Sequence, residues 1–450
     1  MIGFRRGTRE WSTVPGPDVV AVPELVGTLG TGARELADAA VDFGHQVHRR
    51  PLAVLRPGNA ADVAAIVRFG RENGLTVVPR GEGHSVDGQA QVRDGIVVDM
   101  SALAEIGERG PDRISVAAGA RWSAVLGATL PYGTAPPVVV DYLEMSVGGT
   151  LSVGGFSGAT HRHGCQADNV HDLDVVTPDG ELLTCSPKRD ADLFDAVRGS
   201  QGQYGIITRA TLALAPAAST ARRYLLTYHD LGPFLADQRR LVDDRRFDYV
   251  GGQVRYVDGE GWRYLLEAVS TFDPPAEPDD RALLGDLGYD RDTAEIDTGS
   301  YGDFLRRAAA MEAAMRSAGS WQRDPHPRCN LLLPGRHAEA VIGDVLGSLG
   351  PQDIGTGGGV MVYPFPTARI VAPNVARAQD PVTVLFGVQR TAPPDDPQTL
   401  DRMRRANAVL RARVTELGGA AYAYPTAFHD AREAASGRPA PEAAAALPTA

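Results

Sequence analysis

Cysteine is scarce in this chain of 450 residues, which has only Cys165, Cys185 and Cys329. An odd number of cysteines without the spacing of metal ligands argues against a disulfide framework and against a cysteine-based metal site. We therefore expect reduced thiols, as in a cytoplasmic protein.

Long apolar runs and an excess of positive charge are also missing. No segment approaches the length needed to span a bilayer, and no long apolar stretch follows Met1–Arg6, so we expect neither a membrane span nor a secretory signal. The formal net charge of −11 argues against nucleic acid and anionic membranes as partners. The expected partner is a small-molecule substrate, bound by a monomer or a homodimer.

Glycine, in contrast, is plentiful, and one glycine-rich turn, Pro79–Gln89, organises the chain. It lies between two apolar runs, 75–78 and 95–100, that predict short buried strands. Three glycines within eight residues let the backbone approach a bulky ligand, and successive amides can form an anion-binding nest. The spacing is not the dinucleotide pattern G-x-G-x-x-G, and no amphipathic helix follows directly. Taken alone, the turn is also compatible with an ordinary connection between strands.

A second glycine cluster, residues 141–164, supplies a companion motif. Its pattern D-Y-L…S-V-G-G-T-L-S…G-x-S-G…R-H-G, together with R-G-x-G-H-S…G-Q-A-Q in the first turn, resembles the PCMH-type flavin domain of vanillyl-alcohol-oxidase and berberine-bridge flavoproteins. Within that superfamily the chain is most similar to the cytokinin dehydrogenases and their bacterial relatives. The resemblance is dense over roughly residues 45–215 and thin beyond them.

The resemblance implies that the protein binds FAD and that His84 is joined covalently to the 8α carbon of the flavin. Imidazole suits this role because its neutral ring nitrogen is nucleophilic. Some relatives carry a second, cysteinyl link, but this chain has Tyr142 at that position and Cys165 lies elsewhere, so we predict a single link. The alternative is that His84 only forms hydrogen bonds within the turn.

The other cofactor contacts expected from the resemblance come from both glycine loops and one later strand. A carboxylate facing a pyrophosphate is repelled, so the side chain of Glu82 is expected to face solvent while its backbone contacts the cofactor. The full set of expected contacts is Gly81, Glu82, Gly83, His84, Ser85, Gln89, Asp141, Ser146, Gly149, Ser152, Phe156 and Ile207.

Asp141 is the predicted catalytic residue, because it begins the D-Y-L motif. In the dehydrogenases that aspartate takes a proton from the substrate amine during hydride transfer, which is the work of a general base. The alternative is a loop aspartate held by structural hydrogen bonds. Glu144, Glu267 and Tyr424 are further candidates for lining the pocket. The segment His161–His163 contains two histidines, but no third ligand is in view, so no metal is expected.

The predicted fold class is α+β, in two domains. We expect an FAD-binding domain at 1–215, a substrate domain at 216–430 and a disordered tail at 431–450, which has no aromatic residue and one leucine. In the second domain, one sheet should be covered on one face by helices. The expected elements are helices at 60–73, 122–130, 190–198, 232–243, 301–317, 338–349 and 396–417, a hairpin at 173–184, and strands at 204–214, 224–228, 253–256, 264–270, 330–333, 360–363 and 382–389.

The predicted function is that of an FAD-dependent oxidoreductase. It would oxidise a C–N or C–O bond of a small molecule by hydride transfer to a His84-linked flavin, as a biosynthetic tailoring enzyme. The tail lacks the segment that covers the flavin edge in relatives, so two alternatives stay open. One is a cyclisation or rearrangement enzyme with no net redox change, and the other is a non-catalytic binding protein on the same scaffold.

Overall fold

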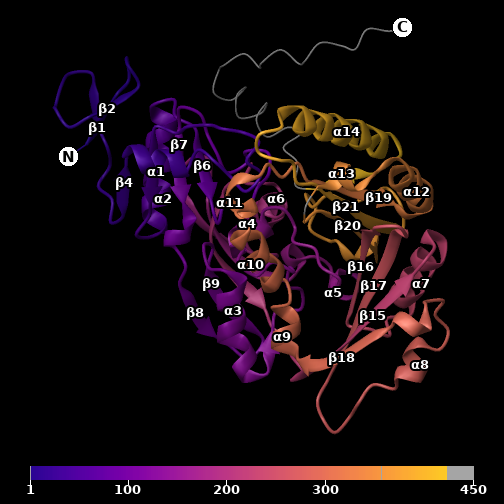
Figure 1. The fold of residues 1–450 in the computed structure, drawn as a ribbon. Coiled ribbons are helices and arrows are strands. Elements are labelled where there is room, and N and C mark those ends of the chain that lie inside the picture. The colour runs from indigo at the N-terminus through magenta and orange to yellow at the C-terminus, as the bar shows by residue number, and fades with distance from the viewer. Residues whose placement is uncertain (1, 356, 423–450) are drawn as a thin grey trace.

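The computed structural model describes residues 2–355 and 357–422, and it consists of two halves that meet along one seam (Figure 1). A four-stranded sheet and a five-stranded sheet build the first half, and one eight-stranded sheet builds the second. The predicted tail and Tyr424 lie outside the described residues. None of the helices in the described ranges is long and apolar enough to cross a membrane.

The smaller sheet of the first half carries the glycine turn at the end of a strand. Its order is β4 (Thr28–Gly30), β5 (Ala53–Arg56), β7 (Ile96–Asp99) and β6 (Val77–Arg80), and β5, β7 and β6 run parallel. Between β5 and β6 the chain forms α2 (Ala60–Glu72), as predicted. The side chain of Asn59 caps α2 by accepting a hydrogen bond from the N–H of Asp62, and the helix packs Ile66 into the core.

The five-stranded sheet of the first half is antiparallel, in the order β12-β11-β13-β9-β8. The predicted hairpin is confirmed, because β11 pairs with β12 across the Pro-Asp-Gly turn. Helix α3 precedes the second glycine loop, and α4, α5 and α6 lie in and after it. The bounds are β8 (Ile106–Arg109), β9 (Arg113–Ala117), α3 (Trp122–Thr129), α4 (Val147–Leu151), α5 (Thr160–His163), β11 (Val170–Val176), β12 (Leu182–Cys185), α6 (Ala191–Val197) and β13 (Ile206–Ala213).

The second half is built on the sheet β18-β15-β17-β16-β20-β21-β19-β22. Helices α7, α12 and α14 cover its outer face (Figure 1), where Phe234, Ile342 and Leu410 pack against strand residues such as Phe386. The strand side chains that point the other way, such as Phe365, pack into the core shared with the first half. The bounds are β15 (Thr220–Tyr228), α7 (Leu231–Asp244), β16 (Tyr249–Val257), β17 (Gly261–Phe272), β18 (Glu295–Ser300), β19 (Cys329–Pro334), α12 (Ala338–Ser348), β20 (Gly359–Pro366), β21 (Val382–Gln389), α14 (Pro397–Glu416) and β22 (Ala420–Ala421).

This arrangement confirms the predicted two-domain α+β fold with a single sheet covered by helices on one face. Strand β14 (Ala215–Pro216) still pairs with β10 (Thr134–Ala135) of the first half, and the large sheet begins at β15. The exact domain boundaries stay a prediction. The sequence did not reveal the N-terminal strands β1 (Gly3–Arg5), β2 (Glu10–Ser12) and β3 (Val19–Ala21), nor β18.

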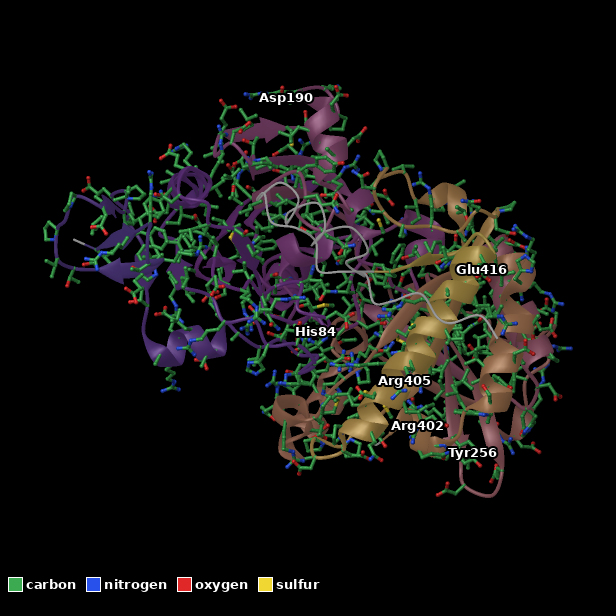
Figure 2. The ribbon with its side chains drawn as sticks, turned by 90° about the horizontal axis from the view of Figure 1, so that it is seen from above. His84, Asp190, Tyr256, Arg402, Arg405 and Glu416 are labelled. Carbon is green, nitrogen blue, oxygen red and sulfur yellow. The ribbon has the colours of Figure 1, made fainter. Side chains whose placement is uncertain are left out.

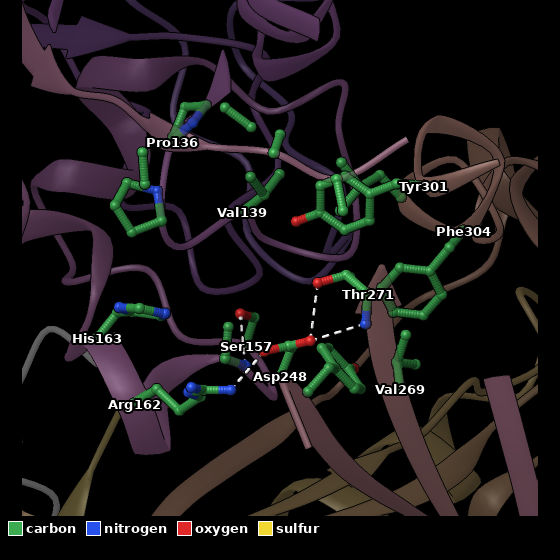
Figure 3. Close-up of a pocket in the computed structure, with 18 of the residues that line it drawn as sticks. Pro136, Val139, Ser157, Arg162, His163, Asp248, Val269, Thr271, Tyr301 and Phe304 are labelled. Atoms are coloured by element: carbon green, nitrogen blue, oxygen red, sulfur yellow. Dashed lines mark hydrogen bonds and ion pairs between the residues drawn. The ribbon is translucent and has the colours of Figure 1, made fainter. Parts of the chain in front are cut away.

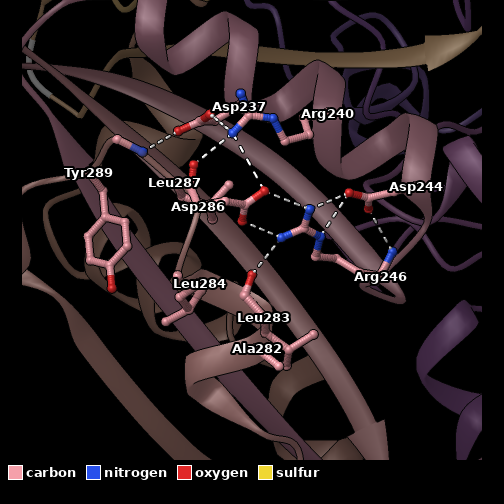
Figure 4. Close-up of polar contacts among 12 residues, drawn as sticks. Asp237, Arg240, Asp244, Arg246, Ala282, Leu283, Leu284, Asp286, Leu287 and Tyr289 are labelled. Atoms are coloured by element: carbon pink, nitrogen blue, oxygen red, sulfur yellow. Dashed lines mark hydrogen bonds and ion pairs between the residues drawn. The ribbon is translucent and has the colours of Figure 1, made fainter.

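A polar network fixes α7 to the segment after α8 (Asp280–Leu284) in the second half (Figure 4). The guanidinium of Arg246 bridges the carboxylates of Asp244 and Asp286. Nearby, the buried carboxylate of Asp237 accepts hydrogen bonds from the Tyr228 hydroxyl at 2.9 Å and the Gly288 N–H at 2.6 Å. The carboxylate of Asp237 therefore satisfies two donors, the Tyr228 hydroxyl and the Gly288 N–H.

The prediction of one continuous helix at 301–317 is wrong. The segment forms α9 (Tyr301–Leu305) and α10 (Ala309–Ser317), and α11 (Ser320–Arg323) follows. Within α10 only Met315 is buried. The break has a physical reason, because Arg307 leaves the helix pattern to meet two carboxylates on the inner face of the large sheet.

Candidate active site

The buried carboxylate of Asp42 shapes the glycine turn. Its Oδ2 accepts hydrogen bonds from the Ser85 hydroxyl at 2.8 Å and the Gly88 N–H at 2.7 Å, and its Oδ1 accepts one from the Gly44 N–H at 3.1 Å. Burial raises the pKa of Asp42, although the hydrogen bond from Ser85 opposes the rise. This role could not be predicted, because Asp42 lies 43 positions before Ser85 and belongs to no motif.

The turn presents unused donors. The backbone N–H groups of residues 82–86 donate to no other group among the residues that the structure describes. Gly83 has φ +65°, a conformation that other residues adopt at a cost, and a Cβ on Gly81 would overlap the Ser146 hydroxyl of the second loop. A row of free amides on a tight turn is an anion-binding nest, which suits a pyrophosphate.

The second glycine loop meets the first at this point. Ser146 precedes α4 and is buried with its hydroxyl toward Gly81, and Gly149 lies within α4. The Ser152 hydroxyl donates to the Gly148 carbonyl at 2.7 Å. The structure thus brings together the two motifs that the sequence separates by about sixty residues.

Two other expected contacts, Phe156 and Ile207, lie buried in the core of the first half. The ring of Phe156 stacks on Phe365 of the second half at 5.3 Å and meets Tyr422 edge-on at 4.9 Å. Phe156 therefore lies where the two halves meet, whereas Ile207 lies in β13 within the core of the first half.

Three expected contacts of the first turn make hydrogen bonds within the protein. The Ser85 hydroxyl donates to Asp42, and Gln89 Oε1 accepts from the Asp87 N–H at 3.0 Å. The side chain of Glu82 was expected to face solvent. Its carboxylate instead forms a bidentate ion pair with Arg121, at 2.9 and 2.8 Å. Arg121 also holds Glu144 at 3.1 Å. The pair offsets the charge that Glu82 would otherwise direct at a phosphate.

His84 lies at the centre of the molecule, at the junction of the two halves (Figure 2). Its ring stacks on Phe43 at 4.3 Å and lies 4.8 Å from the ring of Tyr142 and 5.5 Å from that of Trp321. Burial, followed by the charge of Arg328, lowers the pKa of His84 to about 3. The imidazole is therefore neutral at physiological pH. Neither of its ring nitrogens forms a hydrogen bond with another described residue.

Tyr142 stands beside His84, at the position where the second link would require a cysteine. Its hydroxyl donates to Glu312 of α10 at 2.9 Å. Cys165 is fully buried, and its backbone N–H donates to Asp168 at 2.8 Å. These placements agree with a single attachment point at His84, which stays a prediction.

Asp141, adjacent to Tyr142, belongs to a different group of side chains. Its Oδ1 lies 2.8 Å from Arg307 Nη2, and the Tyr249 hydroxyl donates to it at 3.2 Å. Arg307 also donates to the Tyr249 hydroxyl at 2.7 Å and pairs with buried Glu267 at 3.2 Å. Burial disfavours the cation on Arg307, yet the pKa of Arg307 is raised because Tyr249, Asp141 and Glu267 favour it. Arg307 therefore bridges the two carboxylates, and Glu267 has a second cationic partner in Arg223 at 2.5 Å.

Of the predicted pocket residues, Glu267 thus joins Asp141, whereas Glu144 lies near Glu82. Sequence reasoning missed Arg307 and Tyr249. An arginine within an apparently continuous helix carried no sign that it points inward, and Tyr249 lies before the predicted strand at 253–256, which the structure extends to Tyr249–Val257.

A cavity of about 230 Å³ opens beside this group, between α5 and α9 (Figure 3). Asp141, Tyr249 and Arg307 line one end of it. The remaining walls are mostly apolar, with Val139 and Phe304 among them.

The segment His161–His163 takes a structural place in α5. The ring nitrogens of His161 lie 2.7 Å from the Gly158 carbonyl and 3.2 Å from the Phe247 carbonyl, and Arg162 pairs with Asp248. Burial lowers the pKa of His161 to about 4. Within residues 2–355 and 357–422, no three His, Cys, Asp or Glu side chains are grouped so that they could hold a metal ion.

Comparisons with known protein families agree with the two halves. A model described as an FAD binding domain matches residues 51–186. A second model, described as cytokinin dehydrogenase 1, FAD and cytokinin binding, matches residues 258–424.

Individual relatives match most of the chain. An uncharacterized oxidoreductase, ORF5 in the fasciation locus of Rhodococcoides fascians, is 41% identical over 400 residues, which are 89% of this chain and 90% of that protein. Cytokinin dehydrogenase 5 of Oryza sativa subsp. japonica is 37% identical over 454 residues, covering 88% of this chain and 84% of the relative. Cytokinin dehydrogenase 1 of Arabidopsis thaliana is 35% identical over 392 residues, covering 76% and 66%.

Proposed function

Because the chain belongs to the cytokinin dehydrogenase family of FAD-dependent oxidoreductases, we propose that it oxidises a C–N bond of a small N-alkyl amine, such as a cytokinin. The observation that carries the proposal is that two neighbouring side chains, Asp141 and Tyr142, point to different groups of residues. Tyr142 reaches the ring of His84, while Asp141 presents a carboxylate held by Arg307 and Tyr249. The proposed base is therefore adjacent in the chain to the residue that contacts the proposed attachment point, His84.

The residues of the two glycine loops fit FAD. The free N–H groups of residues 82–86 would hold the pyrophosphate, and the Ser146 hydroxyl lies beside them. We infer a covalent link at His84, because its imidazole is buried, neutral and without a hydrogen-bond partner among the described residues. Bound FAD would supply the acceptor for the two electrons that leave the substrate carbon.

Asp141 takes the proton of the substrate N–H in this mechanism. The nitrogen lone pair then forms the C=N bond of an imine while the electrons of the neighbouring C–H bond leave with their hydrogen. The Tyr249 hydroxyl and Arg307 fix the carboxylate, so that its remaining lone pairs can face the substrate nitrogen. Positioned bases of this kind contribute roughly 10²–10⁴-fold to a rate.

An aromatic wall on the His84 side suits a flat heteroaromatic substrate. The rings of Tyr142 and Trp321 lie 5.3 Å apart, and the guanidinium of Arg316 lies 4.5 Å from the centre of Trp321. Glu312 accepts from the Tyr142 hydroxyl and pairs with Arg316 at 2.7 Å. Stacking on such rings favours a purine over an aliphatic amine. In this proposal the natural substrate belongs to a biosynthetic or modification pathway of N-alkylated heteroaromatic amines.

Two measurements test the proposal. Acid-precipitated wild-type protein should keep its yellow colour in the pellet, and His84→Gln should release all its flavin to the supernatant. Anaerobic addition of N6-isopentenyladenine, an N-alkyl adenine, should bleach the flavin of the wild type. Turnover without any bleaching would instead favour a rearrangement with no net redox change. Flavin found only in the wild-type supernatant would overturn the covalent link.

A further inference from the structure

The cavity beside Asp141 is separate from the predicted flavin site. Of the cofactor contacts expected from the sequence, all of which the structure describes, Asp141 alone lines it. His84, Tyr142 and Trp321 contact one another and are not among the residues that line the cavity. A substrate must contact both the base and the flavin, so the proposed substrate position leaves this cavity unused.

The cavity has a polar path along its walls (Figure 3). The Tyr301 hydroxyl points into the open space and has no hydrogen-bond partner among the described residues. Burial raises the pKa of Tyr301 to about 12, so the hydroxyl keeps its proton. Further along, Asp248 pairs with Arg162 and accepts from the N–H and hydroxyl of Thr271, both at 2.7 Å.

Charged groups of the cavity reach the surface at the Arg162–Asp248 pair. The side chains of Arg162 and Asp248 are 33% and 40% exposed, so this pair marks a mouth of the cavity, and the side chain of Asp141 is itself 40% exposed. A cavity of about 230 Å³ has room for several waters, and the polar groups on its otherwise apolar walls give such waters hydrogen-bond partners.

We propose that this cavity is a proton outlet, in which water held by the Tyr301 hydroxyl and the Arg162–Asp248 pair carries away the proton that Asp141 takes from the substrate. The inference rests on the proposed function. In each turnover the O–H bond of protonated Asp141 breaks, a cavity water accepts that proton, and bulk water or buffer receives one proton at the mouth. No electrons move, and the carboxylate is restored.

Charged and polar groups surround Asp141 and the mouth of the cavity. Arg307 lies 2.8 Å from the carboxylate of Asp141, and Glu267 and the hydroxyls of Tyr249 and Tyr363 complete its surroundings. At the mouth, His163 and Asp248 can accept a proton from the water chain. Burial lowers the pKa of His163, so it is a neutral acceptor there.

The test separates proton uptake from proton release. Flavin bleaching on anaerobic mixing with N6-isopentenyladenine reports transfer to Asp141, and a pH-indicator dye in weak buffer reports arrival in solution. In the wild type the two signals should coincide. Val139→Phe, which fills the cavity, and Tyr301→Phe, which removes the hydroxyl and keeps the ring, should bleach at the wild-type rate while the dye signal lags at least tenfold. Tyr256→Phe, at the exposed tip of the β16–β17 hairpin, is the matched control.

Each other outcome is decisive. A dye signal that keeps pace in both variants shows that the proton leaves elsewhere and overturns the outlet alone. Slower bleaching with a raised half-saturating substrate concentration in both variants shows that the cavity holds the substrate, which also overturns it. A wild-type protein that does not bleach overturns the proposed function, and the outlet falls with it.

Discussion

Arg307 Nη2 lies 2.8 Å from Asp141 Oδ1, and the same guanidinium reaches Glu267 from the break between α9 and α10. The side chain of Arg307 is 19% exposed and that of Glu267 is 5% exposed. A cation that bridges two carboxylates fixes their positions, and its removal leaves Asp141 without an ion pair while Glu267 keeps Arg223. Arg307 is therefore a positioning residue for the proposed base.

Arg307→Gln should lower kcat for N6-isopentenyladenine by about 10–100-fold and change KM little, because it disorders the base and leaves the aromatic wall intact. Arg307→Lys should recover part of the loss, since it keeps the charge without the guanidinium fork. Arg223→Gln is the control, because Arg223 contacts Glu267 at 2.5 Å and does not contact Asp141. An equal loss of kcat in all three variants would show that Arg307 contributes only to the stability of the fold.

Asp42→Ala should reduce the amount of flavin that co-purifies with the protein. The substitution removes the acceptor of three hydrogen bonds that shape the glycine turn, so the N–H groups of residues 82–86 lose their fixed direction. The ratio of flavin to protein absorbance measures the effect. Asp38→Ala, in α1 (Ala33–Asp38) on the surface, is the control, and full flavin content in Asp42→Ala would contradict the role assigned to the carboxylate.

Acid should destabilise the protein partly through His161. Burial lowers the folded-state pKa of His161 to about 4, whereas the unfolded chain has the ordinary value near 6.5. The unfolded state therefore binds the proton first, and the stability present above pH 6.5 is lost as the pH falls toward 4. At about 1.4 kcal/mol per pH unit the loss approaches ~3 kcal/mol.

Urea unfolding at pH 7 and pH 4.5 measures this loss. His161→Gln should show a smaller difference between the two pH values than the wild type, and His48→Gln, at an exposed position, should match the wild type. An unchanged pH dependence in His161→Gln would show that the group does not control acid stability.

Asp237→Ala should lower the free energy of unfolding by about 2–4 kcal/mol, because it leaves the Tyr228 hydroxyl and the Gly288 N–H without their acceptor. Arg240→Ala removes an exposed partner of the same carboxylate and should cost less than about 1 kcal/mol. Thermal or urea denaturation compares the two, and similar losses would argue against the buried hydrogen bonds as the source of stability.

Local patterns in the sequence predicted what depends on neighbours in the chain. Asn59 caps α2 and Gly74 follows it, and the short apolar run at 382–389 forms β21, because caps and apolar runs act over a few residues. The glycine turn was recognised for the same reason. Its closely spaced glycines allow the positive φ angles that the structure shows at Gly83 and Gly88.

The rest depends on contacts that no local pattern encodes. Asp42 meets Ser85 across 43 positions, and its importance comes from burial, which the sequence does not display. Arg307 sits in a run without proline or glycine, so nothing signalled the break of the helix. At the break, the side chain of Arg307 donates hydrogen bonds to Asp141 and Glu267, which lie 166 and 40 positions away in the chain. Trp321 likewise reaches His84 only because α10 and α11 cross the seam.

The most direct test of the account is the rate of anaerobic flavin bleaching by N6-isopentenyladenine in the wild type and in Asp141→Asn. The substitution removes the base and keeps the shape, so flavin content should be unchanged while bleaching slows by about 10²–10⁴-fold. A variant that bleaches at the wild-type rate would contradict the account, because the substrate proton would then be taken by a group other than Asp141.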